Sequence, residues 1–113
     1  MGEAIQSKSI KVYADANGRE PYFEWFKGLK DVKGRARIES RLQRLAVGHF
    51  GDTKSVGEGV SELRMFFGPG YRVYYGEDQG NIVVLLCGGD KGSQKKDIQL
   101  AKNYWQDYLN NER

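Results

Sequence analysis

The stretch of sequence that decides the fold is VSELRMFFGPGYRVYYGEDQGNIVVLLCGG, residues 60–89. Large apolar side chains recur at every second position on both sides of the Gly-Pro-Gly sequence at residues 68–70, which is the period of half-buried β-strands flanking a turn. These alternating positions are Leu63, Met65, Phe67, Tyr71, Val73 and Tyr75. The pattern predicts a β-hairpin.

The other positions of the predicted hairpin carry its candidate functional residues. If a three-residue turn closes the hairpin, Phe66 lies opposite Arg72, and Arg64 lies opposite Tyr74. Residues that face each other across two paired strands lie on the same side of the sheet. We therefore expect Arg64, Arg72, Tyr74 and Phe66 to share one face.

Outward from the hairpin, two further segments are predicted to be strands. Residues 81–87 form a nearly continuous apolar run after a turn at residues 77–80, which is typical of a strand covered on both faces. Residues 10–14 alternate between apolar and polar side chains and are followed by an Asn-Gly pair at residues 17–18. Residues 48–59 contain four glycines and are predicted to be an exposed loop.

Three segments have the helical period. The first begins at Pro21, because proline suits a first helical turn, the second ends near Gly48, and the third follows Ser93, a suitable N-cap. Their apolar stripes are Tyr22, Trp25, Phe26 and Leu29, then Ile38, Leu42 and Leu45, and finally Ile98, Ala101, Trp105 and Leu109. The sequence predicts an α+β fold in one domain, residues 1–113: a small antiparallel sheet of about four strands packed against two N-terminal helices, with a C-terminal helix.

Composition excludes several classes of protein. Hydrophobic residues make up 39% and aromatic residues 12% of the 113 residues, which is too much packing material for a disordered chain. The longest apolar run is far shorter than the roughly 20 residues that cross a bilayer, and the first residues do not resemble an export signal. We expect a cytoplasmic protein without a membrane partner. The single cysteine, Cys87, lies in the apolar run and is expected to be a small buried hydrophobe.

Positive charge is concentrated in one part of the chain. Residues 27–54 contain eight basic and three acidic residues, although the formal net charge of the whole protein is only +3. A basic helix followed by a basic loop is the expected footprint of a phosphate-binding surface, whereas an ordinary solvated helix face is the alternative. The candidate RNA-binding residues are Arg37, Arg41, Arg44 and Lys54, with Lys95 and Lys96 at the start of the last helix.

The familiar enzyme signatures are absent from the sequence, which has one histidine, no paired Cys/His spacing and no nucleotide-binding glycine motif. We therefore predict no metal and no cofactor. What remains is a group of cationic and phenolic side chains near strand ends: Arg64, Arg72, Lys91 and Tyr74. Arginine presents a rigid fork of donors that matches phosphate oxygens, and it can stabilise the charge that develops during phosphoryl transfer.

A structural interpretation of the same residues is also open. Arg64 on an exposed strand face can simply pair with Glu62 or Glu77, and His49 in a polar loop is by default a solvated residue. Whether the arginines are functional therefore depends on whether both reach the same pocket.

Four short motifs, taken together, resemble the HigB-like, phage-derived "addiction module killer" branch of the RelE/ParE toxins. They are ELR at residues 62–64, GPGYRVYY at residues 68–75, LLCGGDK at residues 85–91 and QKKDI at residues 94–98, followed by Ala101. Each motif is weak alone, but their order and spacing match across about residues 36–108.

The resemblance implies a metal-independent endoribonuclease that cuts mRNA on the ribosome, in which the ribose 2′-hydroxyl attacks the adjacent phosphate. By motif, Arg64 would bind the scissile phosphate and Arg72 would stabilise the transition state. Lys91 stands where relatives place a catalytic His, Tyr or Lys, and Tyr74 would stack on a base or assist proton transfer. The sequence identifies no general base.

The resemblance also implies partners. It predicts a cognate antitoxin with a helix-turn-helix domain, and contact with operator DNA only through the toxin–antitoxin complex. Two other functions fit the same fold: a ParE-like protein that binds DNA gyrase without nuclease activity, and a nucleic-acid-binding module without toxicity.

Overall fold

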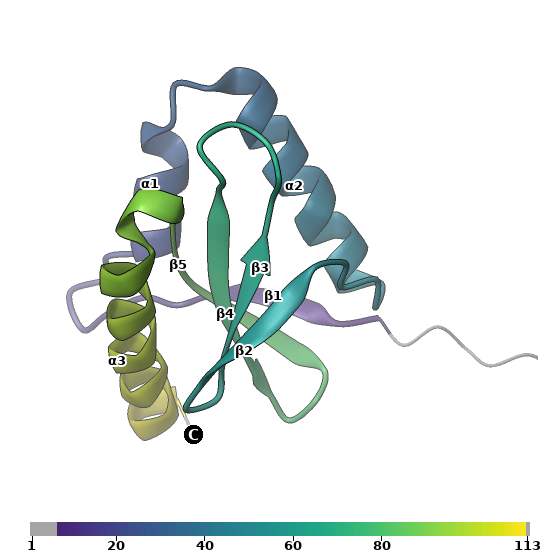
Figure 1. The fold of residues 1–113 in the computed structure, drawn as a ribbon. Helices are drawn as coiled ribbons and strands as arrows, with labels where there is room; N and C mark the ends of the chain where they lie inside the picture. The colour runs from purple at the N-terminus through teal and green to yellow at the C-terminus, as the bar shows by residue number, and fades with distance from the viewer. Residues whose placement is uncertain (1–6, 113) are drawn as a thin grey trace, which may run out of the picture.

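A computed structural model describes residues 7–112, which form a five-stranded sheet with helices on both faces (Figure 1). The elements, in chain order, are β1 (Ser9–Val12), α1 (Pro21–Gly28), α2 (Val32–Ala46), β2 (Thr53–Gly57), β3 (Val60–Arg64), β4 (Arg72–Asp78), β5 (Ile82–Gly89), a 3₁₀ turn η1 (Lys91–Ser93) and α3 (Gln94–Glu112). The predicted α+β class, with two N-terminal helices and a C-terminal helix, is confirmed.

The sheet differs from the prediction in strand number and direction. Its order is β1-β5-β4-β3-β2, and β1 pairs with β5 in parallel, so the sheet is mixed and not purely antiparallel. A parallel pair needs a long crossover, which the chain between β1 and β5 supplies through two helices and three strands. The first strand was expected over residues 10–14 and is Ser9–Val12 in the structure.

The strand that the sequence did not predict, β2, lies inside the segment predicted to be a loop. Residues Thr53–Gly57 pair with β3 in an antiparallel ladder that is interrupted between Ser55 and Gly57. The prediction was wrong here because this strand is short and polar, and it owes its conformation to the neighbouring edge of β3. Glu58 and Gly59 both have positive φ, the combination that a two-residue hairpin turn requires.

The predicted hairpin of β3 and β4 exists, but its register differs by two residues. Arg64 lies opposite Arg72, and Glu62 lies opposite Tyr74, because the connection spans residues 65–71 instead of the three predicted residues. A shift of one residue would have turned every side chain to the other face, whereas a shift of two preserves the face. The expectation that Arg64, Arg72 and Tyr74 share one side of the sheet is therefore confirmed. Phe66, which was expected opposite Arg72 on the same face, instead lies in the connecting loop outside the paired strands.

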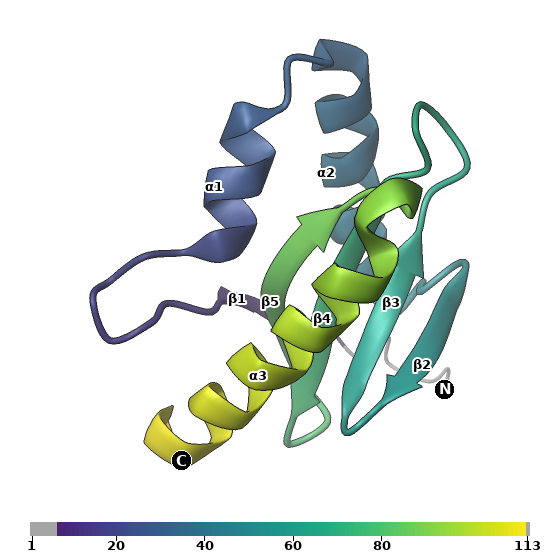
Figure 2. The same cartoon turned by 60° about the vertical axis from the view of Figure 1, so that its left-hand side comes forward.

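Two hydrophobic cores flank the sheet. On one face, β3, β4 and β5 pack against α1 and α2 around fully buried Ile38, Leu45 and Leu63. On the other face, Tyr74, Leu86 and their neighbours pack against α3. Figure 2 shows α3 crossing this second face. The run at residues 81–87 is thus a strand covered on both sides, as predicted.

The helices begin near the predicted positions, but the N-cap before the last helix is not the predicted residue. Asp31 caps α2 by accepting a hydrogen bond from the Gly34 N–H at 2.9 Å. Asp90, and not Ser93, is the N-cap before η1 and α3, and Ser93 completes a capping box with it. Within residues 7–112, every helix is too short or too polar to cross a membrane.

Candidate functional site

The candidate site lies at the end of the sheet where the loop of residues 65–71 meets the N-terminal halves of α2 and α3 (Figures 1 and 2). Two contacts hold this loop. The Tyr71 hydroxyl donates to Asp31, at the start of α2, at 2.9 Å, and the Lys91 N–H approaches the Pro69 carbonyl at 3.4 Å. Segments that are far apart in the sequence, including all four predicted catalytic residues, thus converge on one end of the fold.

Arg72 is held by a buried polar network. Its Nε lies 3.7 Å from Glu62 Oε2, and its Nη1 donates to the Gly70 carbonyl at 3.3 Å. The Glu62 carboxylate is 1% exposed and also accepts hydrogen bonds from the Tyr74 hydroxyl at 3.0 Å and from Gln94 Nε2 at 2.8 Å. The buried Arg72 Nε makes no hydrogen bond, so the guanidinium is positioned by its ion pair with Glu62 and by the hydrogen bond of its Nη1 to Gly70.

Tyr74 belongs to this network and not to the surface. The side chain is completely buried, so the expected stacking of its ring on an RNA base is wrong. Burial, followed by the nearby Glu62 carboxylate, raises the pKa of Tyr74 well above its ordinary value. The phenol therefore stays protonated and acts as a hydrogen-bond donor to Glu62.

Arg64 is more accessible than Arg72. Its Nη2 lies 3.1 Å from Asp52 Oδ1, and its side chain is 33% exposed, against 9% for Arg72. The sequence had suggested Glu62 or Glu77 as partners of Arg64, but the structure gives it Asp52 and gives Glu62 to Arg72. Each arginine thus has a carboxylate beside it. The guanidinium of Arg64 also lies 5.9 Å from the centre of the Phe66 ring.

A cavity of about 410 Å³ opens beside this pair of arginines. It is lined by Arg72, by Lys91 from η1 and by the loop of residues 65–70, including Phe66. The loop is close to Lys91, since a Cβ placed on Gly70 would lie 3.3 Å from the Lys91 Cβ. The structure therefore brings two of the predicted catalytic cations, Arg72 and Lys91, to one cavity. The expectation that Arg64 reaches the same pocket as Arg72 is wrong, because Arg64 does not line this cavity and lies next to its Phe66 wall.

A second cavity, of about 370 Å³, lies against α2 and shares Phe66 and Phe67 with the first. It is lined by Arg37, Ser40, Arg41, Arg44, Phe66 and Phe67. Two hydrogen bonds hold the Arg41 side chain against the fold, since it donates to the Arg64 carbonyl at 2.8 Å and to the Phe50 carbonyl at 3.3 Å. Arg37 and Arg44 are exposed. Three of the predicted RNA-binding residues thus line one cavity.

The other predicted RNA-binding residues surround the same end of the sheet without lining either cavity. Lys54 lies on β2 directly opposite Glu62 and is exposed, and Lys95 and Lys96 are exposed in the first turn of α3. His49 is exposed just after α2 and contributes to neither cavity.

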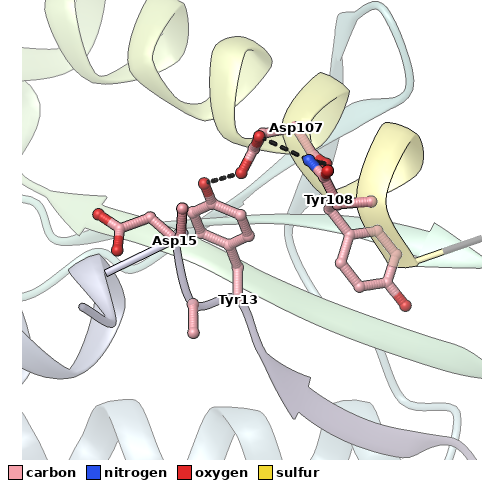
Figure 3. A pocket seen from close by; sticks show the side chains of 7 residues that line it. Tyr13, Asp15, Asp107 and Tyr108 are labelled. Carbon is pink, nitrogen blue, oxygen red and sulfur yellow. Dashed lines mark hydrogen bonds between the residues drawn. The ribbon is translucent and has the colours of Figure 1, made fainter. Parts of the chain in front are cut away.

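A third cavity has a different character (Figure 3). It measures about 370 Å³ and lies between the residues after β1 and the last turns of α3. Its polar groups include Asp15 and Asp107, and the Tyr13 hydroxyl donates to Asp107 at 2.6 Å. Two carboxylates make this cavity unfavourable for a phosphate, so it is not part of the candidate nucleic-acid surface.

The remaining candidate groups are accounted for by burial or position. Cys87 is 5% exposed, and burial raises the pKa of its thiol to about 12, which agrees with a small buried hydrophobe and not a nucleophile. Among the described residues, no three His, Cys, Asp or Glu side chains are grouped so that they would hold a metal ion.

Sequence reasoning missed the residues that position or shield the arginines. Asp52 lies in a loop, as predicted, but its contact with Arg64 was not predicted, and Glu62 and Gln94 were not assigned to the site. Glu62 carried a usable signal, because it is a charged residue at an alternating strand position two residues before Arg64. Gln94 carried none, because its contact depends on how α3 crosses the sheet.

The sequence of this chain is similar to a known family and to a known protein. Residues 24–106 match the model of the family described as phage derived protein Gp49-like (DUF891). An uncharacterized protein of Haemophilus influenzae is 51% identical over 78 residues, which cover 69% of this chain and 79% of that protein. The Gp49-like family is associated with addiction-module toxins. The chain belongs to the Gp49-like family of phage-derived proteins.

Proposed function

We propose that this protein is the toxin of a type II toxin–antitoxin system and that it cleaves mRNA on the ribosome without a metal ion. The observation that carries the proposal is the cavity that Arg72 and Lys91 line together, with the Arg64 guanidinium beside its Phe66 wall. Cations fixed around a cavity are suited to the developing charge of phosphoryl transfer, and the adjacent arginines of α2 are suited to neighbouring phosphates. The family's association with addiction modules supports a toxin over other RNA-binding proteins.

In the proposed reaction, the ribose 2′-oxygen attacks the adjacent phosphorus and its proton passes to solvent. The bond from phosphorus to the 5′-oxygen breaks, which leaves a 2′,3′-cyclic phosphate and a 5′-hydroxyl. Arg72 stabilises the extra negative charge on the phosphoryl oxygens, because Glu62 and the Gly70 carbonyl fix its position before the substrate arrives. Lys91 stabilises the leaving 5′-oxygen and supplies its proton. The ribosome aligns the mRNA for attack.

Arg64 is assigned to binding the substrate phosphate. Its side chain is accessible, and its partner Asp52 is itself partly exposed, so a phosphate can replace the carboxylate without opening the core. Arg72 needs no such exchange, since Glu62 lies behind it in the fold. The two arginines thus have different tasks.

We further propose that a small antitoxin with a helix-turn-helix domain neutralises the toxin by covering the basic cavities, and that operator DNA is contacted only through that complex. Charge complementarity supports this arrangement, because an acidic segment would satisfy the arginines of α2.

The test is cleavage in a translating extract, read by primer extension. Wild-type protein should cut mRNA only while it is translated, and Arg72→Ala should lose both cleavage and growth inhibition. Arg19→Ala is the matched control, because it removes an exposed arginine that pairs with Glu24 and lines neither arginine-lined cavity. Intact mRNA together with gyrase-dependent DNA breaks would instead establish a gyrase poison. Unchanged growth on expression without an antitoxin would establish a non-toxic nucleic-acid-binding module.

A further inference from the structure

Phe66 is an aromatic side chain with an unusual degree of exposure. It is 79% exposed, more than Phe23 at 39% or Val32 at 67%. It lies in the loop of residues 65–71, whose neighbouring aromatic residue Tyr71 is buried and anchored to Asp31. The loop is therefore held in place while the Phe66 ring projects from it.

The position of Phe66 between two cation-lined cavities is more informative than its exposure. Phe66 lines the cavity that contains Arg72 and Lys91, and it also lines the cavity formed by the arginines of α2. Phe67 also lines both cavities but is half-buried, so Phe66 is the exposed ring that two sites suited to a phosphate share.

Arginines also surround this loop. The Arg64 guanidinium lies 5.9 Å from the centre of the Phe66 ring, and the Arg37 guanidinium lies 5.1 Å from the centre of the neighbouring Phe67 ring. Both distances are within the range of cation–π attraction, which favours a defined arrangement of the rings and guanidinium groups.

We propose that Phe66 is a stacking platform for one unpaired RNA base, and that the phosphates on the two sides of that nucleotide occupy the two cavities. This inference rests on the proposed function and adds the position of the substrate. A strand bound in this way crosses the loop from the α2 arginines to Arg72 and Lys91. The alternation of an aromatic face with cationic sites matches the alternation of bases and phosphates in a single strand.

A protein partner is the other occupant that an exposed phenylalanine suggests. Single-stranded RNA fits better because both cavities that the ring lines contain cations, three arginines in one and Arg72 with Lys91 in the other, whereas the core of a protein interface is depleted in charged residues. An acidic protein segment is treated below as an outcome of the test.

The experiment measures binding of a single-stranded RNA hexamer that carries 2′-O-methyl groups, so that the attacking hydroxyl is blocked and cleavage does not interfere. One central base is 2-aminopurine, whose fluorescence falls when it stacks on an aromatic ring. Phe66→Ala should weaken binding by about five- to a hundredfold, the loss expected for one base–aromatic stack, and should abolish the quenching. Phe66→Tyr should retain both.

Phe23→Ala is the matched control, because it removes another exposed phenylalanine from a region that lies at neither arginine-lined cavity. A hexamer with an abasic site at the central position provides a second control. It should bind wild-type protein and Phe66→Ala with the same affinity, because no base remains to stack. The same variants are compared for mRNA cleavage in a translating extract.

The outcomes separate the two proposals. If wild-type protein binds or cleaves RNA but Phe66→Ala stays within twofold of it in both assays, the stacking platform is wrong and the proposed function stands. If wild-type protein neither binds the hexamer nor cleaves translated mRNA, both fall. If Phe66→Ala leaves RNA binding unchanged and instead releases an acidic antitoxin, the exposed ring is a protein-docking residue.

Discussion

Arg64 and Arg72 lie directly opposite each other on β3 and β4, and each has a carboxylate beside it. Like charges at opposed positions of a sheet are destabilising, so Asp52 and Glu62 are needed to keep the two guanidinium groups together. The pairs differ in depth: Asp52 and Arg64 are partly exposed, whereas Glu62 and Arg72 are nearly buried. A substrate phosphate can therefore replace Asp52 beside Arg64, whereas Glu62 stays beside Arg72. We expect different effects when each carboxylate is substituted.

Removing the charge of Asp52 should strengthen RNA binding. In Asp52→Asn, a phosphate no longer competes with a carboxylate for Arg64, and we expect the affinity for a single-stranded RNA to rise by about two- to fivefold at low salt. Fluorescence anisotropy measures this change. Glu24→Gln is the control, because it makes the same change in net charge at the exposed Arg19–Glu24 pair. An equal gain in both variants would point to net charge and not to Arg64.

Removing the hydroxyl of Tyr74 should affect stability more than chemistry. Tyr74→Phe leaves Glu62 without one of its buried donors and should lower the free energy of unfolding by about 1 kcal/mol. Glu62→Gln should cost more, about 1.5–3 kcal/mol, because it removes the negative charge beside Arg72 and replaces one acceptor oxygen by an amide donor. Urea denaturation measures both values.

Tyr74→Phe also tests the chemical role of Tyr74. If its phenol only orients Glu62, mRNA cleavage per folded molecule changes less than threefold in Tyr74→Phe, which is a change of about 0.6 kcal/mol or less in the activation free energy. A drop of about a hundredfold with unchanged RNA affinity would mean that the phenol takes part in proton transfer.

Acid stability should depend on Asp31. The Gly34 N–H, followed by the Tyr71 hydroxyl, holds the pKa of Asp31 below its ordinary value. A carboxylate with a lowered pKa in the folded state stabilises the fold above its unfolded pKa, about 3.9, and this contribution is lost as the pH falls through the lower, folded value. Asp31→Asn should therefore be less stable than wild type at pH 7, and the difference in Tm should shrink toward pH 3. A difference that stays constant between these pH values would contradict this role.

The sequence predicted those features that repeat along the chain. Alternation located β1, β3 and β4, a continuous apolar run located β5, and the helical period located the three helices. The shared face of Arg64 and Arg72 was predicted correctly although the register was not, because an error of two residues leaves the face unchanged. Periodicity therefore predicts the sheet face on which a side chain lies more reliably than it predicts the residue opposite it on the next strand.

Features that depend on contacts between distant segments were not predictable. The strand β2 has a polar sequence, and only the open edge of β3 makes it a strand. The burial of Tyr74 follows from α3 crossing its face of the sheet, and the Glu62–Arg72 pair follows from the register. No pattern within a short stretch of sequence predicts these arrangements.

The packing of α3 on the sheet gives a last prediction, at Gly76 in the middle of β4. A Cβ at this position would lie 2.6 Å from the Trp105 ring, which is 5% exposed in the core. Gly76→Ala should therefore lower the free energy of unfolding by about 1–3 kcal/mol, as overpacking does, measured by urea denaturation. Gly28→Ala is the control, since a Cβ there meets open space, and its stability should be unchanged or higher by up to about 1 kcal/mol. Adding Trp105→Phe to Gly76→Ala should recover part of the loss, because a smaller ring makes room for the methyl group. If the two substitutions are simply additive, the close approach of α3 to β4 is not what requires glycine at this position.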